Sequence, residues 1–113
     1  MLRDIEALID IQDSIELIYT YVQDIDRKSL ENNIEKQDAI VRRLIVIGEA
    51  TKRLSAQFRE QHSEIPWKQI AGMRDIITHD YDEIELEEIW SVIQKDLVTL
   101  KNYIKPLIEN PPF

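Results

Sequence analysis

The sequence contains no cysteine, so it can form neither a disulfide framework nor a thiolate metal site. It has only two glycines and no glycine-rich phosphate loop, which excludes ATP binding of the P-loop kind. No apolar run approaches the roughly 18 residues that a membrane span needs. The first ten residues carry acids where a signal peptide would carry a basic run and an apolar core. We therefore expect a soluble, cytoplasmic protein that needs no cofactor and contacts no membrane.

The chain has 113 residues, the length of one domain, and a formal net charge of −8. This charge argues against non-specific binding to nucleic acid, which relies on neutralising phosphates with lysine and arginine. It leaves room for a local basic patch. One candidate is the second predicted helix, where four cations could follow an RNA backbone, although a solvated polar face is the preferred explanation; they are Arg42, Arg43, Lys52 and Arg53.

Apolar residues recur at helical spacing along the first half of the chain, with no alternating strand pattern. The spacing predicts a first helix over about residues 2–26. The polar stretch DRKSLENN then indicates a loop. A second helix is expected from about Glu35 through Phe58, some six turns. Gly48 lies on the edge of its apolar stripe, which favours a close helix crossing there, because a mid-helix glycine costs roughly 1 kcal/mol.

The second half of the chain predicts two more helices. Pro66 suits the first turn of a third, short helix that ends around residues 79–81. Asp82 begins a capping-box pattern for a fourth helix, which should kink or stop near Pro106. Trp67 and Trp90 fall on positions typical of a core.

Four helices with short connections predict an all-α, up-and-down bundle with a short third helix. We expect a single domain over residues 1–110 and a loose tail over residues 111–113. The apolar faces are broad, and a homodimer would cover the excess.

The stretch GMRDIITHDY contains the chemistry of a small reaction site. Asp75 lies one helical turn before His79, so its carboxylate can accept the imidazole N–H and fix the tautomer. Arg74 and His79 are five residues apart, so an ideal helix points them about 140° away from each other. Either the helix unwinds near Thr78, or two copies of the segment face each other across a two-fold axis.

Arginine and histidine without a metal suit the cleavage of RNA. Histidine can take the proton of a ribose 2′-hydroxyl or give one to the leaving oxygen, and arginine can bind the charged phosphate. The structural alternative is that His79 lies at the C-terminal end of its helix and interacts favourably with the helix dipole, while Arg74 forms a surface ion pair. His62 lies 17 residues from His79 without metal-ligand spacing, so we expect no zinc site and a solvated His62 in a loop. The acids of YDEIELEEIW are expected to favour a helix start.

Three blocks of the sequence resemble the HepT-like toxins, a branch of the HEPN superfamily of small helical RNases. QDAIVRRLIVIGEATKRLS resembles the second-helix signature of that family, and IWSVIQKDLVTL resembles its last helix. Between them, EIPWKQIAGMRDIITHDY resembles the central block, with Arg74, His79 and Tyr81 filling the R-x-x-x-x-H-x-Y pattern. At position 75 these RNases often have asparagine where this chain has Asp75, which we assign only a supporting role.

The resemblance implies a metal-independent RNA endonuclease that acts as a homodimer, with paired motifs in a cleft between the subunits and tRNA as a candidate substrate. It also implies the toxin of a toxin–antitoxin pair. The antitoxin would be an MntA-like minimal nucleotidyltransferase that transfers AMP from ATP to Tyr81. The added phosphate could pair with Arg74 and block the site. The alternative is a non-catalytic helical module that dimerises and binds a nucleotidyltransferase.

Overall fold

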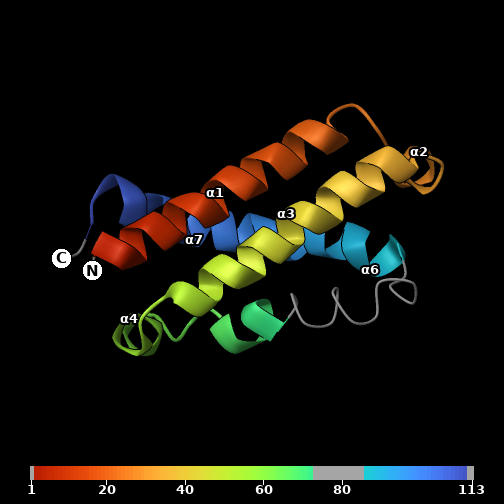
Figure 1. The fold of residues 1–113 in the computed structure, drawn as a ribbon. Helices are drawn as coiled ribbons and strands as arrows, with labels where there is room; N and C mark the ends of the chain where they lie inside the picture. The colour runs from red at the N-terminus through yellow and green to blue at the C-terminus, as the bar shows by residue number, and fades with distance from the viewer. Residues whose placement is uncertain (1, 73–85, 112–113) are drawn as a thin grey trace.

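The computed structural model describes residues 2–72 and 86–111, and all regular structure within these ranges is helical (Figure 1). The first helix, α1, covers Leu2–Val22 and ends slightly earlier than the predicted 26. Its buried face runs through Leu8, Ile11, Ile15 and Ile18, with spacings of three and four.

The stretch DRKSLENN is not a loop throughout, because it contains a short helix, α2, over Arg27–Glu31. The Asp26 side chain caps this helix by accepting a 2.8 Å hydrogen bond from the Ser29 backbone N–H. Leu30 is completely buried and fixes the turn to the core. Three of the polar residues that suggested a loop, Asp26, Asn32 and Asn33, are therefore helix caps. The next helix, α3, covers Ile34–Arg53 and lies alongside α1 in Figure 1.

The predicted six-turn second helix is interrupted. Leu54 has an extended backbone (ψ 139°), and a separate helix, α4, covers Ala56–Gln61. The hydroxyl oxygen of Ser55 caps α4 by accepting a 3.0 Å hydrogen bond from the Phe58 N–H. Phe58 is nonetheless buried, as its place on the apolar stripe predicted. Gly48 is also buried within α3.

The last helix contains an irregular turn that the sequence pattern does not predict. Helix α6 covers Leu86–Ser91, a π-helical turn, η2, covers Val92–Asp96, and α7 covers Leu97–Glu109. Residues four apart on an α-helix drift about 40° around the axis. Ile89, Ile93 and Leu97 are successively four apart, and all three are buried, because the wider π turn keeps them on one face.

Pro106 lies inside α7, which continues one turn further to Glu109, so the helix does not stop at the proline. Pro106 and Asn102 are both exposed, and the Asn102 carbonyl that the proline leaves without a backbone donor can bond water. The predicted loose tail falls on residues 111–113, of which 112–113 lie outside the described residues.

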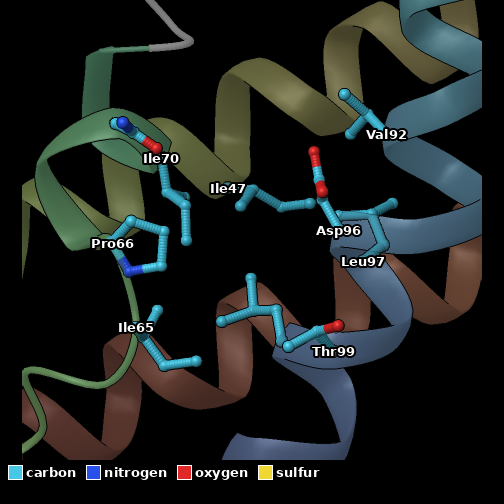
Figure 2. A pocket seen from close by; sticks show the side chains of 10 residues that line it. Ile47, Ile65, Pro66, Ile70, Val92, Asp96, Leu97 and Thr99 are labelled. Atoms are coloured by element: carbon cyan, nitrogen blue, oxygen red, sulfur yellow. The ribbon is translucent and has the colours of Figure 1, made fainter.

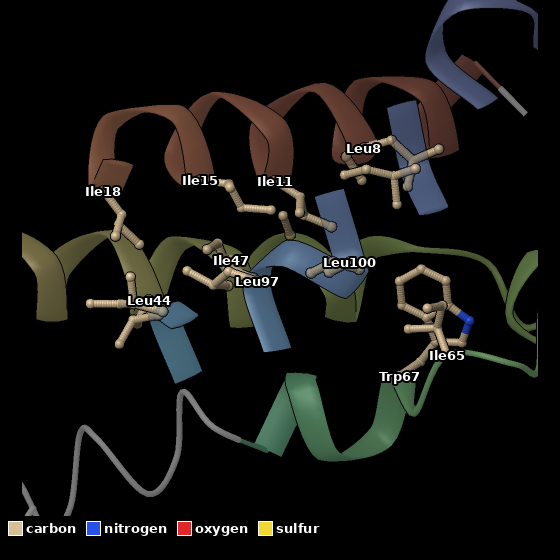
Figure 3. Packing of buried hydrophobic residues seen from close by; sticks show 14 of the residues in the cluster. Leu8, Ile11, Ile15, Ile18, Leu44, Ile47, Ile65, Trp67, Leu97 and Leu100 are labelled. Atoms are coloured by element: carbon tan, nitrogen blue, oxygen red, sulfur yellow. The ribbon is translucent and has the colours of Figure 1, made fainter. Parts of the chain in front are cut away.

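The core joins α1, α3 and the C-terminal helix (Figure 3). Its largest fully buried side chains come from all three of these elements, with Leu30 from α2, Phe58 from α4 and Leu54 from between α3 and α4. Trp67 is buried in this core, as predicted, and the half-buried Trp90 packs against it. Among the described helices, none is long and apolar enough to cross a membrane.

Candidate functional site

The predicted reaction site falls in the part of the chain that the structure does not describe. Arg74, Asp75, His79 and Tyr81 all lie within residues 73–85, together with the expected distortion at Thr78 and the capping box from Asp82. The structure describes the two segments that flank this stretch. These are residues 67–72, which are helical, and the start of α6.

The segment that leads into the motif is anchored in the core. Pro66 immediately precedes the helix, and its carbonyl accepts a 3.1 Å hydrogen bond from the Ile70 N–H. Trp67 is 4% exposed. Its indole N–H donates a 2.7 Å hydrogen bond to the His62 carbonyl, and its ring lies 5.7 Å from that of Phe58. The core therefore holds the start of the segment that leads to Arg74 in a fixed position.

The segment that follows the motif is tied to α2. Arg27 of α2 lies 3.7 Å from Glu87, in an exposed ion pair. Glu87 and Glu88 occupy the first turn of α6, where carboxylates interact favourably with the helix dipole. This placement agrees with the role expected for these acids. Ile89 then anchors α6 in the core.

A groove lies beside the segment that leads into the motif, with a cavity volume of about 240 Å³ (Figure 2). We call it the Ile47 groove. Its apolar lining comes from Ile47, Ile65, Ile70, Val92, Leu97 and Leu100. Its polar lining comes from Gln69, Asp96 and Thr99.

Sequence distance limits how far the motif can lie from this groove. Arg74 follows Ile70, a lining residue, by only four positions. An extended chain spans at most about 3.6 Å per residue, so the two Cα atoms lie within about 14 Å of each other. Reasoning from the sequence did not identify this groove, because α3, residues 65–70 and the η2–α7 region meet there only in the folded chain.

The sequence suggested that His62 is a solvated loop residue, and this prediction is wrong. Its ring is half-buried and lies 4.4 Å from that of Phe58. His62 Nδ1 lies 2.8 Å from the Tyr103 hydroxyl, which donates a 3.0 Å hydrogen bond to the Glu64 carboxylate. Because the single hydroxyl proton goes to Glu64, His62 Nδ1 must carry a proton and donate to Tyr103.

This hydrogen-bond chain perturbs the acid–base behaviour of its members. Burial and the hydrogen bond to Glu64 raise the pKa of Tyr103. A hydrogen bond from the Glu64 backbone N–H and the one from Tyr103 lower the pKa of Glu64. The hydrogen bonds among His62, Tyr103 and Glu64 connect the turn after α4 to α7, and they hold the segment just before Trp67 in place.

The predicted basic track is not one continuous line. At about 100° per residue, Arg42 and Arg53 share the exposed face of α3, whereas Arg43 and Lys52 fall on opposite flanks. Arg53 is paired with Asp10 of α1. These four residues therefore form no single row of charge.

Lys52 and Arg53 instead line a hollow of about 660 Å³ together with Arg3, Glu6 and Ser55. We call it the Arg3 hollow. Arg3 was not identified from the sequence as a candidate. It reaches this place because the start of α1 lies beside the end of α3, as the contact between Asp4 and Ser55 shows. An antiparallel pairing of the first two long helices would have predicted this.

No group of three or more potential metal ligands occurs among residues 2–72 and 86–111. Sequence comparison gives a consistent family relationship. The family model described as "Ribonuclease HepT-like" matches residues 11–107. No solved structure matches the chain significantly.

Three relatives illustrate the match. A protein of Methanocaldococcus jannaschii, whose name joins gamma-glutamylcyclotransferase to RNase, is 39% identical over 96% of this chain and 50% of its own length. A protein named as an RNase in Caldanaerobacter subterraneus is 45% identical over 63% of each chain. A protein of Thermococcus cleftensis named "probable ribonuclease HepT" is 34% identical over 90% of this chain and 93% of its own. The chain thus spans about half to two thirds of the first two relatives.

Proposed function

Because the chain belongs to the HepT-like ribonuclease family, we propose that it is a ribonuclease and the RNA-cutting toxin of a toxin–antitoxin pair, acting in the cytoplasm. The observation that carries the proposal is the extent of the family match. Residues 11–107 include the whole R-x-x-x-x-H-x-Y pattern as well as both flanking segments.

The proposed reaction needs no metal. His79 takes the proton from the ribose 2′-hydroxyl or gives one to the leaving 5′-oxygen, a contribution of about two to four orders of magnitude in rate. Arg74 binds the non-bridging phosphate oxygens, where negative charge builds up in the transition state. Asp75 supports the motif by orienting His79. Transfer RNA is the candidate substrate.

We propose that the working unit is a homodimer of up-and-down four-helix bundles. Arg74 and His79 diverge by about 140° on a regular helix, so one copy of an undistorted motif cannot direct both at one phosphate. Two motifs across a two-fold axis supply one acid and one base from a single kind of histidine. The all-helical architecture and the α1–α3–α7 core are consistent with such a bundle.

Tyr81 is the proposed point of control. An MntA-like nucleotidyltransferase would transfer AMP from ATP to its hydroxyl, forming a phosphodiester and releasing pyrophosphate. The new negative charge would pair with Arg74 in place of the substrate. Incubation with the partner and ATP should raise the intact mass in units of AMP. Labelling that persists in Tyr81→Phe would move the acceptor to another tyrosine.

The RNA backbone is proposed to contact the basic residues of α3. Lys52 and Arg53 are the stronger candidates, because Arg3 joins them in one hollow. Arg42 and Arg43 would contact a different stretch of RNA.

The net charge of −8 supports one competing function, a non-catalytic module that dimerises and binds a nucleotidyltransferase. Purified, unmodified protein separates the two. We expect the wild type to cut RNA in excess EDTA and His79→Ala to cut at least a hundredfold more slowly with an unchanged melting temperature. Asn102→Ala, an exposed change on α7, is the control and should cut normally. If the unmodified wild type leaves all RNA intact, the binding module is the better description.

A further inference from the structure

The Ile47 groove is bounded on two sides by apolar side chains. Pro66 and Ile70 lie on one side of it, and Val92 and Leu97 lie on the other (Figure 2). Its volume of about 240 Å³ is below the roughly 300–1,000 Å³ of sites that hold drug-sized ligands. A single heterocycle between aliphatic side chains suits this space better than a complete nucleotide.

The polar groups of the groove are mainly acceptors. Asp96 is exposed, and its carboxylate stands on the η2–α7 side beside Ile47 (Figure 2). Thr99 already donates its hydroxyl proton to the Lys95 carbonyl at 3.2 Å, so its oxygen is left to accept. Gln69 supplies an amide that can both donate and accept. A ligand that fits must therefore present neighbouring donors and at least one acceptor.

We propose that the Ile47 groove binds a nucleobase of the RNA and selects guanine through Asp96. The N1–H and the N2 amino group of guanine are adjacent donors, which a carboxylate can accept in a bidentate manner. Guanine O6 then accepts from the Gln69 amide. Adenine and cytosine offer one amino group on this edge, and uracil offers a lone N3–H between two oxygens that repel a carboxylate.

The position of the groove gives this selection a use. The proposal rests on the ribonuclease function, and Arg74 lies within about 14 Å of Ile70 along the chain. One RNA strand can therefore have a base in the groove and a nearby phosphate at the motif. The π turn supports the assignment, because its first and last residues, Val92 and Asp96, both line the groove, and such turns occur often at functional sites.

Binding of short RNAs to the full-length His79→Ala protein tests the proposal without any need for cleavage. The probes are fluorescent uridine oligomers with one central guanosine, inosine, adenosine or cytidine. Inosine retains N1–H and O6 but lacks the N2 amino group. We expect guanosine to bind about tenfold more tightly than inosine, since inosine cannot make the second hydrogen bond to the charged acceptor. Asp96→Asn should abolish this difference.

Glu88→Gln is the matched control, because it removes one exposed carboxylate of α6 outside the groove and should keep the preference. Equal binding of all four probes, or a guanosine preference that survives in Asp96→Asn, would overturn the proposal. It would also be overturned if Val92→Asp changed the oligomeric state and left the base preference intact, because the groove would then be a protein contact. Failure of the ribonuclease function appears separately, as wild-type protein that binds RNA and does not cut it.

Discussion

The Asp4 carboxylate accepts two hydrogen bonds from Ser55, one from its backbone N–H at 2.7 Å and one from its hydroxyl at 2.8 Å. The same hydroxyl oxygen accepts from the Phe58 N–H at 3.0 Å. One serine thus joins the first turn of α1 to the start of α4, across 51 positions of sequence. Asp4 is almost completely buried, at 3% exposed.

Replacing Asp4 by asparagine should lower the free energy of unfolding by about 2 kcal/mol at pH 7, because the variant cannot make these hydrogen bonds to a charged acceptor. Burial raises the pKa of Asp4, but the hydrogen bonds from Ser55 and the positive charge of the N-terminus together outweigh it and hold the pKa below its ordinary value of 3.8. The stabilisation is therefore complete above about pH 4 and is lost as the pH falls through the lower pKa of the folded state. Denaturant unfolding between pH 7 and pH 3 measures both effects.

Asp13→Asn is the control for this experiment, since Asp13 is exposed on the same helix. It should leave both the stability and its acid dependence nearly unchanged. An Asp4→Asn protein that lost stability toward pH 3 as steeply as the wild type would contradict the assignment to Asp4.

Tyr103→Phe should lower the free energy of unfolding by about 1 kcal/mol, because the variant has no hydroxyl to bond with His62 and Glu64. The raised pKa of Tyr103 predicts a second effect at high pH. The neutral phenol stabilises the fold up to about pH 10, and this contribution disappears as the pH rises through the higher pKa of the folded state. Melting temperatures from pH 8 upward should fall more steeply for the wild type than for Tyr103→Phe, and parallel curves would argue against the hydrogen-bond chain.

Trp67→Phe tests whether the anchor before the motif matters for catalysis. The variant leaves the His62 carbonyl without its indole donor, so we expect a loss of about 1–2 kcal/mol in stability. Because residues 67–72 lead directly to Arg74, kcat should also fall roughly tenfold or more through misplacement of the motif. Trp90→Phe, which changes a half-buried tryptophan of α6, is the comparison. Equal effects of the two changes on kcat would remove the special role of Trp67.

The Arg3 hollow should strengthen RNA binding through charge alone. Changing Arg3, Lys52 and Arg53 together to glutamine should reduce the slope of log affinity against log salt by about 0.7 for each phosphate that the variant no longer neutralises. The paired change of Arg42 and Arg43 separates the hollow from the middle of α3. Stability should change little in either variant, since surface ion pairs such as Arg53–Asp10 contribute at most about 1 kcal/mol. A slope unchanged in the triple variant would place the RNA elsewhere.

The long elements were predictable because their apolar residues recur with the helical period. The faces of α1, α3 and α7 follow directly from spacings of three and four. The breaks between elements were harder. Asp26 and Ser55 each cap a short helix, and a polar residue reads the same in a cap as in a loop or on a solvated face. Period alone could not separate these roles.

The candidate site also has one part that the sequence predicts and another part that it does not. Arg74, His79 and Tyr81 are recognisable because their chemistry and spacing are local in the sequence. The Ile47 groove, the placement of Arg3 and the contacts of His62 depend on which distant segments meet, and a single sequence carries little signal for that. Pairing α1 antiparallel to α3 would have recovered Arg3, but not the groove.

The π turn of η2 has a consequence for how this protein can evolve. A π turn is an α-helix carrying one surplus residue, so a one-residue deletion between Ile93 and Leu97 would restore a regular helix. The hydrophobic residues on either side could keep their partners while Asp96 turned toward a new direction. Losing or gaining one residue in this helix can therefore change the direction of a groove side chain, while the packing of the core stays the same.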